Sequence, residues 1–198
     1  MLIYLLRHTA VDVPHGVCYG RTDVPLAPDS AAQIAATLER LPLTARRATR
    51  VWSSPAGRCL ELARALCAEP ALDDRLAEFD FGVWEGRSWD DVPRAELDCW
   101  SADLAGYTVP GGESMADLSA RARAFMQECV TPEPGLTHAP GDDPSDVVLV
   151  THGGVIRALL ADALGMPAER IFRLQVDYGS VSALAQDGTG LRVAFVNR

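Results

Sequence analysis

The sequence has no excess of positive charge. Its 18 lysine and arginine residues are outnumbered by 27 aspartate and glutamate residues, which gives a formal net charge of −9 and a pI of about 4.8. Surfaces that bind nucleic acids are basic, so this balance argues against a nucleic acid as partner. An anionic substrate must be held by a local cluster of arginines, because the field of the whole protein does not attract it.

Paired cysteines are also lacking. The five cysteines stand at positions 18, 59, 67, 99 and 129, an odd number without any C-x-x-C pair. This arrangement argues against a disulfide framework and against a structural zinc site. The expected location is therefore the reducing cytoplasm, with no bound metal.

The sequence also lacks long hydrophobic runs. The apolar run over residues 2–6 is too short to cross a bilayer and no basic region precedes it, so we expect a strand and no membrane association. Hydrophobic residues make up 48% of the 198 residues, as in ordinary soluble proteins. This length predicts a single domain over residues 1–198.

Strand-like and helical patterns alternate along the chain. Strands are expected over residues 2–6, 50–53 and 147–150, helices over 29–41, 57–68, 114–130 and 153–164, and a final hairpin around Asp187 and Gly188. Ser114 and Asp117 fit a capping box at the start of the third helix. The weakly periodic residues 79–112 predict a lid-like insertion, and the proline-rich residues 131–145 predict a surface loop. The alternation predicts an α/β fold with a mostly parallel sheet.

Two histidines each follow a buried strand. His8 comes after Arg7 at the end of the first strand, and His152 follows the strand over residues 147–150. Arg58 stands in the first turn of a helix, where backbone N–H groups favour an anion. Each residue alone is compatible with an ordinary surface role. Ligands of such sheets bind beyond the carboxyl ends of the strands, so together the three indicate a phosphate-handling pocket.

Five motifs occur in an order that resembles the histidine phosphatase superfamily (branch one), whose fold is called phosphoglycerate-mutase-like. They are Arg7-His8-Thr9, Ser53-Ser54-Pro55 with Arg58, Glu78 with Gly82 and Glu85-Gly86, Pro110-Gly111-Gly112-Glu113-Ser114, and Thr151-His152-Gly153-Gly154. The similarity spans residues 3 to about 157. It implies a three-layer α/β/α sandwich with a mostly parallel central sheet, and a phosphatase that needs neither metal nor cofactor.

The resemblance implies a role for each site residue. His8 would be the nucleophile, attacking phosphorus as a neutral ring to form a phosphohistidine. Arg7 and Arg58 would grip the phosphoryl oxygens, and His152 would donate to them in the transition state. Glu78 would protonate the leaving oxygen and then accept a proton from water.

The acidic residues leave alternatives open. Glu78 could be an ordinary exposed acid, with Glu85 or Asp80 as the proton donor, although its position in the motif favours Glu78 and a structural role for Glu85. Glu113 could either brace the site or cap the following helix.

The stretch over residues 11–26 resembles one group within this superfamily, the α-ribazole phosphatases of cobalamin biosynthesis. On that resemblance Tyr19, Arg21 and Gly153 would contact the substrate, a small-molecule phosphomonoester, although residues 18–20 could be a plain turn. Trp84, Trp89 and Trp100 could stack on a flat base or simply pack in the core. The sequence leaves a homodimer open.

Three other functions remain as alternatives: a broad-specificity phosphatase, a phosphoglycerate mutase and a catalytically dead phosphate-binding protein. Residues 79–82 offer no extra cation for the second phosphate of a mutase substrate. The joint presence of both histidines, both arginines and a carboxylate candidate argues against a dead enzyme.

Overall fold

The computed structural model describes residues 1–43, 45–47, 50–130, 146–187 and 190–198. Within these ranges six strands form one sheet in the order β3-β2-β4-β1-β5-β6. The strands are β1 (Leu2–Arg7), β2 (Arg50–Ser53), β3 (Ala71–Leu72), β4 (Val147–Thr151), β5 (Val181–Asp187) and β6 (Gly190–Phe195). β1, β2, β3 and β4 are parallel to one another, and only β5 runs the other way, pairing antiparallel with β1 on one side and β6 on the other, so the predicted mostly parallel sheet is confirmed.

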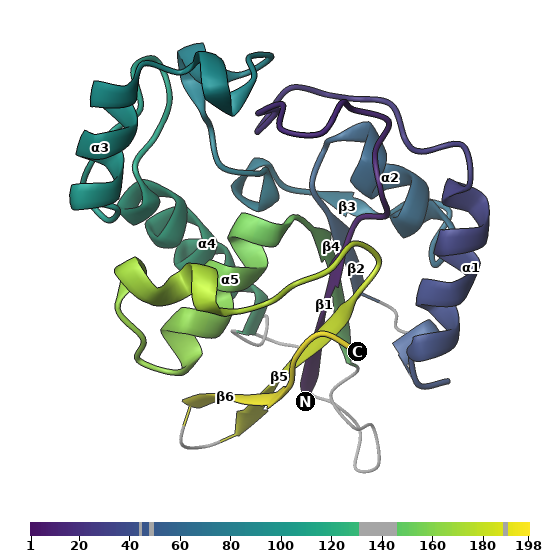
Figure 1. Ribbon diagram of the computed structural model, residues 1–198. Coiled ribbons are helices and arrows are strands. Elements are labelled where there is room, and N and C mark those ends of the chain that lie inside the picture. Colours follow the sequence, from purple (N-terminus) through teal and green to yellow (C-terminus); the bar gives the residue numbers. More distant parts are fainter. Residues whose placement is uncertain (44, 48–49, 131–145, 188–189) are drawn as a thin grey trace.

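Helices cover both faces of the sheet (Figure 1). On one face lie α1 (Ser30–Arg40) and α2 (Gly57–Arg64), and on the other α4 (Met115–Val130) and α5 (Gly153–Ala163). Successive side chains of a strand point to opposite faces, so each central strand feeds two cores. In β1, Ile3 and Leu5 pack in the core beneath α4 and α5, and Tyr4 and Leu6 pack in the core beneath α1 and α2.

The remaining described helices are short. They are the 3₁₀ turns η1 (Ala45–Arg47), η2 (Asp74–Leu76), η3 (Gly82–Trp84), η4 (Trp89–Asp91) and η5 (Ala168–Arg173), and the α-helix α3 (Arg94–Ala102). None of the helices in the described ranges is long and apolar enough to cross a membrane.

The predicted elements agree closely with the observed ones. The capping box at α4 forms as expected: Ser114 Oγ accepts from the Asp117 backbone N–H at 3.1 Å, and the Asp117 carboxylate accepts from the Ser114 N–H at 2.9 Å. The prediction for α2 was too long, because the helix ends at Arg64 and the Leu66 and Cys67 N–H groups both turn back onto the Ala63 carbonyl. The two-residue β3 was missed, since both of its side chains are exposed and give no apolar run.

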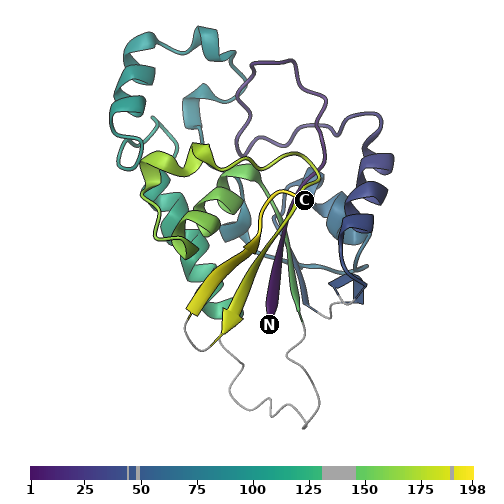
Figure 2. The same cartoon turned by 60° about the horizontal axis from the view of Figure 1, so that its bottom comes forward.

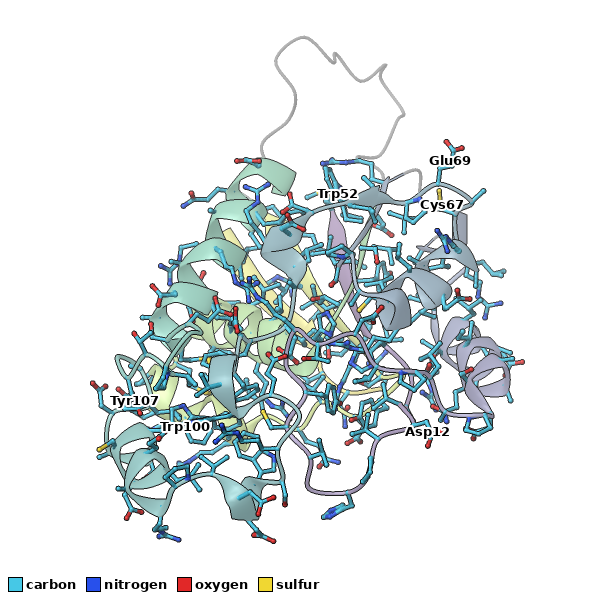
Figure 3. All side chains as sticks on the ribbon, turned by 90° about the horizontal axis from the view of Figure 1, so that it is seen from above. Asp12, Trp52, Cys67, Glu69, Trp100 and Tyr107 are labelled. Atoms are coloured by element: carbon cyan, nitrogen blue, oxygen red, sulfur yellow. The ribbon has the colours of Figure 1, made fainter. Side chains whose placement is uncertain are left out.

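The segment over residues 79–112 carries η3, η4 and α3 above the carboxyl end of the sheet (Figure 1). Its tryptophans pack on one another, with the rings of Trp89 and Trp100 stacked at 6.2 Å and those of Trp84 and Tyr107 at 6.2 Å. Figure 3 shows Trp100 and Tyr107 together at one side of the molecule. These aromatic contacts correspond to the packing alternative for the tryptophans, because the rings stabilise the segment by contacting one another.

The C-terminal hairpin lies beside β1 (Figure 2), with Leu184 of β5 paired to Ile3. The loop predicted over residues 131–145 and the tip of the hairpin at 188–189 lie outside the described residues.

Candidate active site

The register of two central strands brings the two histidines together. Parallel pairing of β1 with β4 sets Arg7 opposite Thr151, and the next residue of each strand is a histidine. The His8 N–H donates to the Thr151 carbonyl at 3.0 Å, which extends the ladder by one step. The two imidazole rings meet edge to face, with centroids 5.1 Å apart. Sequence positions 144 residues apart therefore form one feature at the carboxyl edge of the sheet.

The His8 ring is held in its neutral form. Its Nδ1 lies 2.8 Å from the Thr9 carbonyl oxygen, which can only accept, so Nδ1 carries the proton and Nε2 keeps its lone pair. Burial, together with the positive charges of Arg58 and Arg7, lowers the pKa of His8 to about 3. The ring is thus neutral, with a single N–H, at any physiological pH.

Two arginines flank this ring, and each has an N–H group that is not engaged in a hydrogen bond with any residue that the structure describes. Arg58, buried in the first turn of α2, donates to the carbonyl oxygens of Thr22 at 2.9 Å and Gly20 at 2.7 Å. Arg7 donates to the Val176 carbonyl at 2.6 Å. The Nε–H of each guanidinium is buried and has no partner among the described residues. An unpaired buried donor is costly, so both groups are suited to an incoming anion.

His152 lies fully buried behind the pocket. Its Nε2 is 2.8 Å from Ser54 Oγ and 3.5 Å from Cys59 Sγ. Burial lowers the pKa of His152 well below its usual value, and the positive charges of Arg58 and Arg7 lower it further. The second histidine is therefore also a neutral ring, able to donate one N–H.

Glu78 reaches the same pocket from the loop after η2. Its carboxylate accepts hydrogen bonds from the backbone N–H of Phe79 at 2.9 Å and of Gly154 at 3.1 Å, in the first turn of α5. A side chain at position 154 would overlap a Glu78 carboxylate oxygen, so the glycine permits this contact. Glu78, Arg58 and His152 all line one cavity of about 450 Å³.

Two histidines, two arginines and a carboxylate thus converge at one edge of the sheet. The sequence model of the histidine phosphatase superfamily (branch 1) matches residues 3–198. The chain belongs to this superfamily.

Known histidine phosphatase relatives carry several different names. A glucosyl-3-phosphoglycerate phosphatase of Mycolicibacterium vanbaalenii is 34% identical over 84% of this chain and 76% of its own length. A protein of Salmonella paratyphi C named probable phosphoglycerate mutase is 31% identical over 92% of this chain and 83% of its own. The crystal structure of α-ribazole phosphatase from Shigella flexneri covers all of this chain and 96% of its own with a TM-score of 0.81, but at 23% identity it shows the fold alone.

Two of the predicted substrate contacts lie close to the site: Arg21 in the wall of the cavity, and Tyr19 with its ring centroid 5.4 Å from the Arg58 guanidinium carbon. Arg21 lines the cavity, and its guanidinium is 3.6 Å from carboxylate oxygens of both Asp80 and Glu113. Tyr19 Oη lies 2.5 Å from Tyr178 Oη. Gly153, the third, packs against Arg7 and Arg157, whose guanidinium atoms a Cβ there would approach within 3.4 Å.

Tyr178 is a site residue that sequence reasoning missed. Its ring lies under the Arg7 guanidinium, with Cζ 3.8 Å from the ring centroid, and 5.5 Å from the His8 ring. It stands in the loop before β5, where no motif marks it. A tyrosine in a loop has no periodicity or spacing that could have revealed this position.

Glu85 and Asp80, the two acidic alternatives to Glu78, both accept hydrogen bonds from backbone N–H groups. Glu85 accepts from the N–H groups of Arg21 at 2.8 Å, Thr22 at 2.7 Å and Phe81 at 3.1 Å, tying two loops together. Asp80 accepts from the Gly82 N–H at 2.9 Å. Glu113 braces the site by accepting from the Asp80 N–H at 3.0 Å, while Ser114 and Asp117 form the cap of α4.

Proposed function

We propose that this protein hydrolyses phosphate monoesters through a phosphohistidine on His8. The observation that carries the proposal is a neutral, buried histidine between two arginines that each keep one buried N–H without a partner. A phosphoryl group would give both donors an acceptor, with charge-assisted bonds of the kind that Arg forms with phosphate.

Two chemical steps complete the cycle. In the first, the His8 Nε2 lone pair forms a bond to phosphorus, the ester P–O bond breaks, and the leaving oxygen takes a proton from the Glu78 carboxyl. In the second, water gives its proton to the Glu78 carboxylate and its oxygen bonds to phosphorus, while the P–N bond breaks. Arg7, Arg58 and His152 donate to the phosphoryl oxygens in both steps, where such preorganised donors stabilise the transition state.

The substrate we propose is α-ribazole 5'-phosphate, which would place the protein in cobalamin biosynthesis in the cytoplasm. The resemblance of residues 11–26 supports this substrate, and so does the charge of the pocket wall. Arg21 shares its charge with Asp80 and Glu113, and Asp23 lies 3.7 Å from Arg58. Each arginine that lines the cavity thus has a carboxylate beside it. Such a wall suits a substrate whose leaving group carries no second negative charge.

Glucosyl-3-phosphoglycerate is the second candidate, because the 34% identical relative is named for that activity. Its carboxylate, and the second phosphate of a mutase substrate, would each need a cation that this wall does not keep free. Arg21 would have to exchange its two carboxylate partners to serve as one.

The deciding experiment uses purified protein with EDTA present. We expect turnover of p-nitrophenyl phosphate between pH 5 and 8, and loss of at least about 1,000-fold in the His8→Ala variant. Wild type quenched in alkaline detergent during turnover should carry phosphate on histidine, and acid treatment should release it. Absence of turnover across this range would refute the phosphatase. Equal kcat/KM for α-ribazole 5'-phosphate, glucosyl-3-phosphoglycerate and sugar phosphates would reduce the proposal to a broad phosphatase.

A further inference from the structure

The loop that carries Glu78 has no strand or helix to hold its backbone. It joins η2 to η3, and its Ala77 and Glu78 carbonyl groups, together with the Arg75 carbonyl of η2, accept hydrogen bonds from a single side chain. That side chain is Arg121, from the second turn of α4. Backbone groups that are buried need partners, and here one guanidinium supplies them.

Every donor of Arg121 is used. Its Nη1 donates to the Arg75 and Ala77 carbonyls, both at 2.7 Å, and its Nη2 donates to the Glu78 carbonyl at 3.0 Å. The remaining donors go to the carboxylate of Glu113, at 2.7 Å from Nη2 and 3.0 Å from Nε. A guanidinium has five N–H groups, so none is left for a substrate. Arg121 can act on the reaction only through the residues it holds.

Glu113 extends this grip to the other side of Glu78. The same carboxylate that receives Arg121 also accepts the Asp80 N–H at 3.0 Å. One largely buried ion pair, whose side chains are 15% and 11% exposed, therefore holds the carbonyls up to and including that of Glu78 and the N–H of Asp80. We call Arg121 and Glu113 the clamp.

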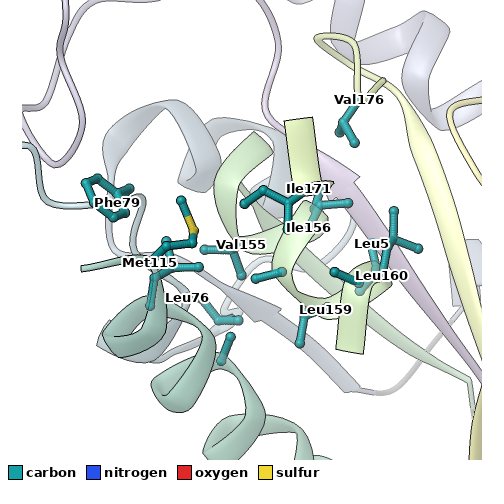
Figure 4. Close-up of a cluster of buried hydrophobic side chains, with 14 of the residues drawn as sticks. Leu5, Leu76, Phe79, Met115, Val155, Ile156, Leu159, Leu160, Ile171 and Val176 are labelled. Carbon is teal, nitrogen blue, oxygen red and sulfur yellow. The ribbon is translucent and has the colours of Figure 1, made fainter. Parts of the chain in front are cut away.

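Packing alone does not set this backbone. Leu76 and Phe79, on either side of Glu78, are buried beside Met115 and Val155 (Figure 4), which anchors the two ends of the turn. The peptides between them are oriented by the clamp. Their orientation decides where the Glu78 carboxylate points, since its own contacts are two single backbone N–H groups.

We propose that Arg121 is a positioning residue for the proton donor Glu78. This inference rests on the proposed function, because it concerns the step in which the leaving oxygen takes its proton. A misplaced general acid costs about 10²–10⁴-fold in rate. The cost falls on substrates whose leaving oxygen needs the proton, and p-nitrophenolate leaves readily without one.

The test compares glycerol 3-phosphate, a poor leaving group, with p-nitrophenyl phosphate in the Arg121→Met variant. We expect kcat to fall about 100-fold or more on glycerol phosphate and by less than about threefold on p-nitrophenyl phosphate. Adding Arg121→Met to Glu78→Gln should change glycerol phosphate turnover by less than about twofold, because both act on one proton transfer. Arg123→Met is the matched control: it lies on the same helix and pairs with Asp162 at the surface.

Should Arg121→Met not fold by circular dichroism, Glu113→Gln keeps the size of the clamp and removes one charge. Equal losses on the two substrates, or additive losses in the double variant, would overturn the positioning role and leave a structural one. Wild-type protein that hydrolyses neither substrate would instead refute the proposed function.

Discussion

At the scale of single residues, the site depends on arginine rather than on cations in general. All 18 basic residues of the chain are arginines. Arg58 divides its donors among two carbonyls and an unpaired position, and Arg121 uses five donors on five contacts. A lysine has three donors on one nitrogen and cannot reproduce either pattern. The planar fork lets one residue bind a substrate anion or a backbone turn.

The neutral state of His8 predicts a pH-dependent loss of stability. Its pKa is about 3 in the folded protein, against about 6.5 in an unfolded chain. Below pH 6.5 the unfolded state binds a proton that the folded state refuses, so stability is lost as the pH falls toward 3.

Between pH 7 and pH 5 this single group should lower the free energy of unfolding by about 2 kcal/mol. The His8→Gln variant should lose about 2 kcal/mol less than wild type over that interval. Urea unfolding at both pH values without phosphate measures the difference, and parallel losses in the two proteins would show that His8 is not buried as a neutral ring.

At the scale of elements, the strands and their histidines could be predicted, but the contacts between loops could not. The apolar runs of β1 and β4 and the glycines after His152 leave a local pattern in the sequence. The meeting of Arg7 with Tyr178 and of Arg121 with the loop around Glu78 joins segments 171 and 43 residues apart. No local pattern encodes such pairs, because they depend on where whole elements pack. Whether Glu113 braces the site or caps the following helix likewise could not be decided from the sequence, because the answer depends on its distance to the Asp80 N–H.

The capping box of α4 predicts that removing its serine hydroxyl lowers the stability of the protein, whereas removing an exposed serine hydroxyl on another helix does not. Ser114 Oγ accepts the Asp117 N–H and donates to the Asp117 carboxylate at 2.6 Å. Ser114→Ala should lower the free energy of unfolding by about 1 kcal/mol, the usual cost of losing a cap. Ser101→Ala on α3, whose hydroxyl is exposed, is the control in the same thermal unfolding series. A loss at Ser101 equal to that at Ser114 would contradict the cap.

At the scale of the whole molecule, the net charge of −9 opposes anionic substrates that the pocket must nevertheless accept. Arg58 is buried and Arg7 is partly buried, whereas the cavity wall carries Asp23 and Asp74 at exposed positions. In the proposed reaction the phosphoryl group would bind to the arginines, whereas a second anion on the leaving group would remain near these carboxylates. Global charge and local wall therefore favour the same class of substrate.

A matched pair of substrates tests this discrimination. Glycerol 3-phosphate and 3-phosphoglycerate share a carbon skeleton and differ by a hydroxymethyl group in place of a carboxylate. We expect kcat/KM to favour glycerol 3-phosphate by about tenfold at low ionic strength, equivalent to about 1.4 kcal/mol. Because salt shortens the range of charge interactions to about 10 Å at 0.1 M, the preference should shrink as salt is added. A preference for 3-phosphoglycerate would mean that Arg21 leaves its carboxylate partners for the substrate, and that the wall recognises a second anion.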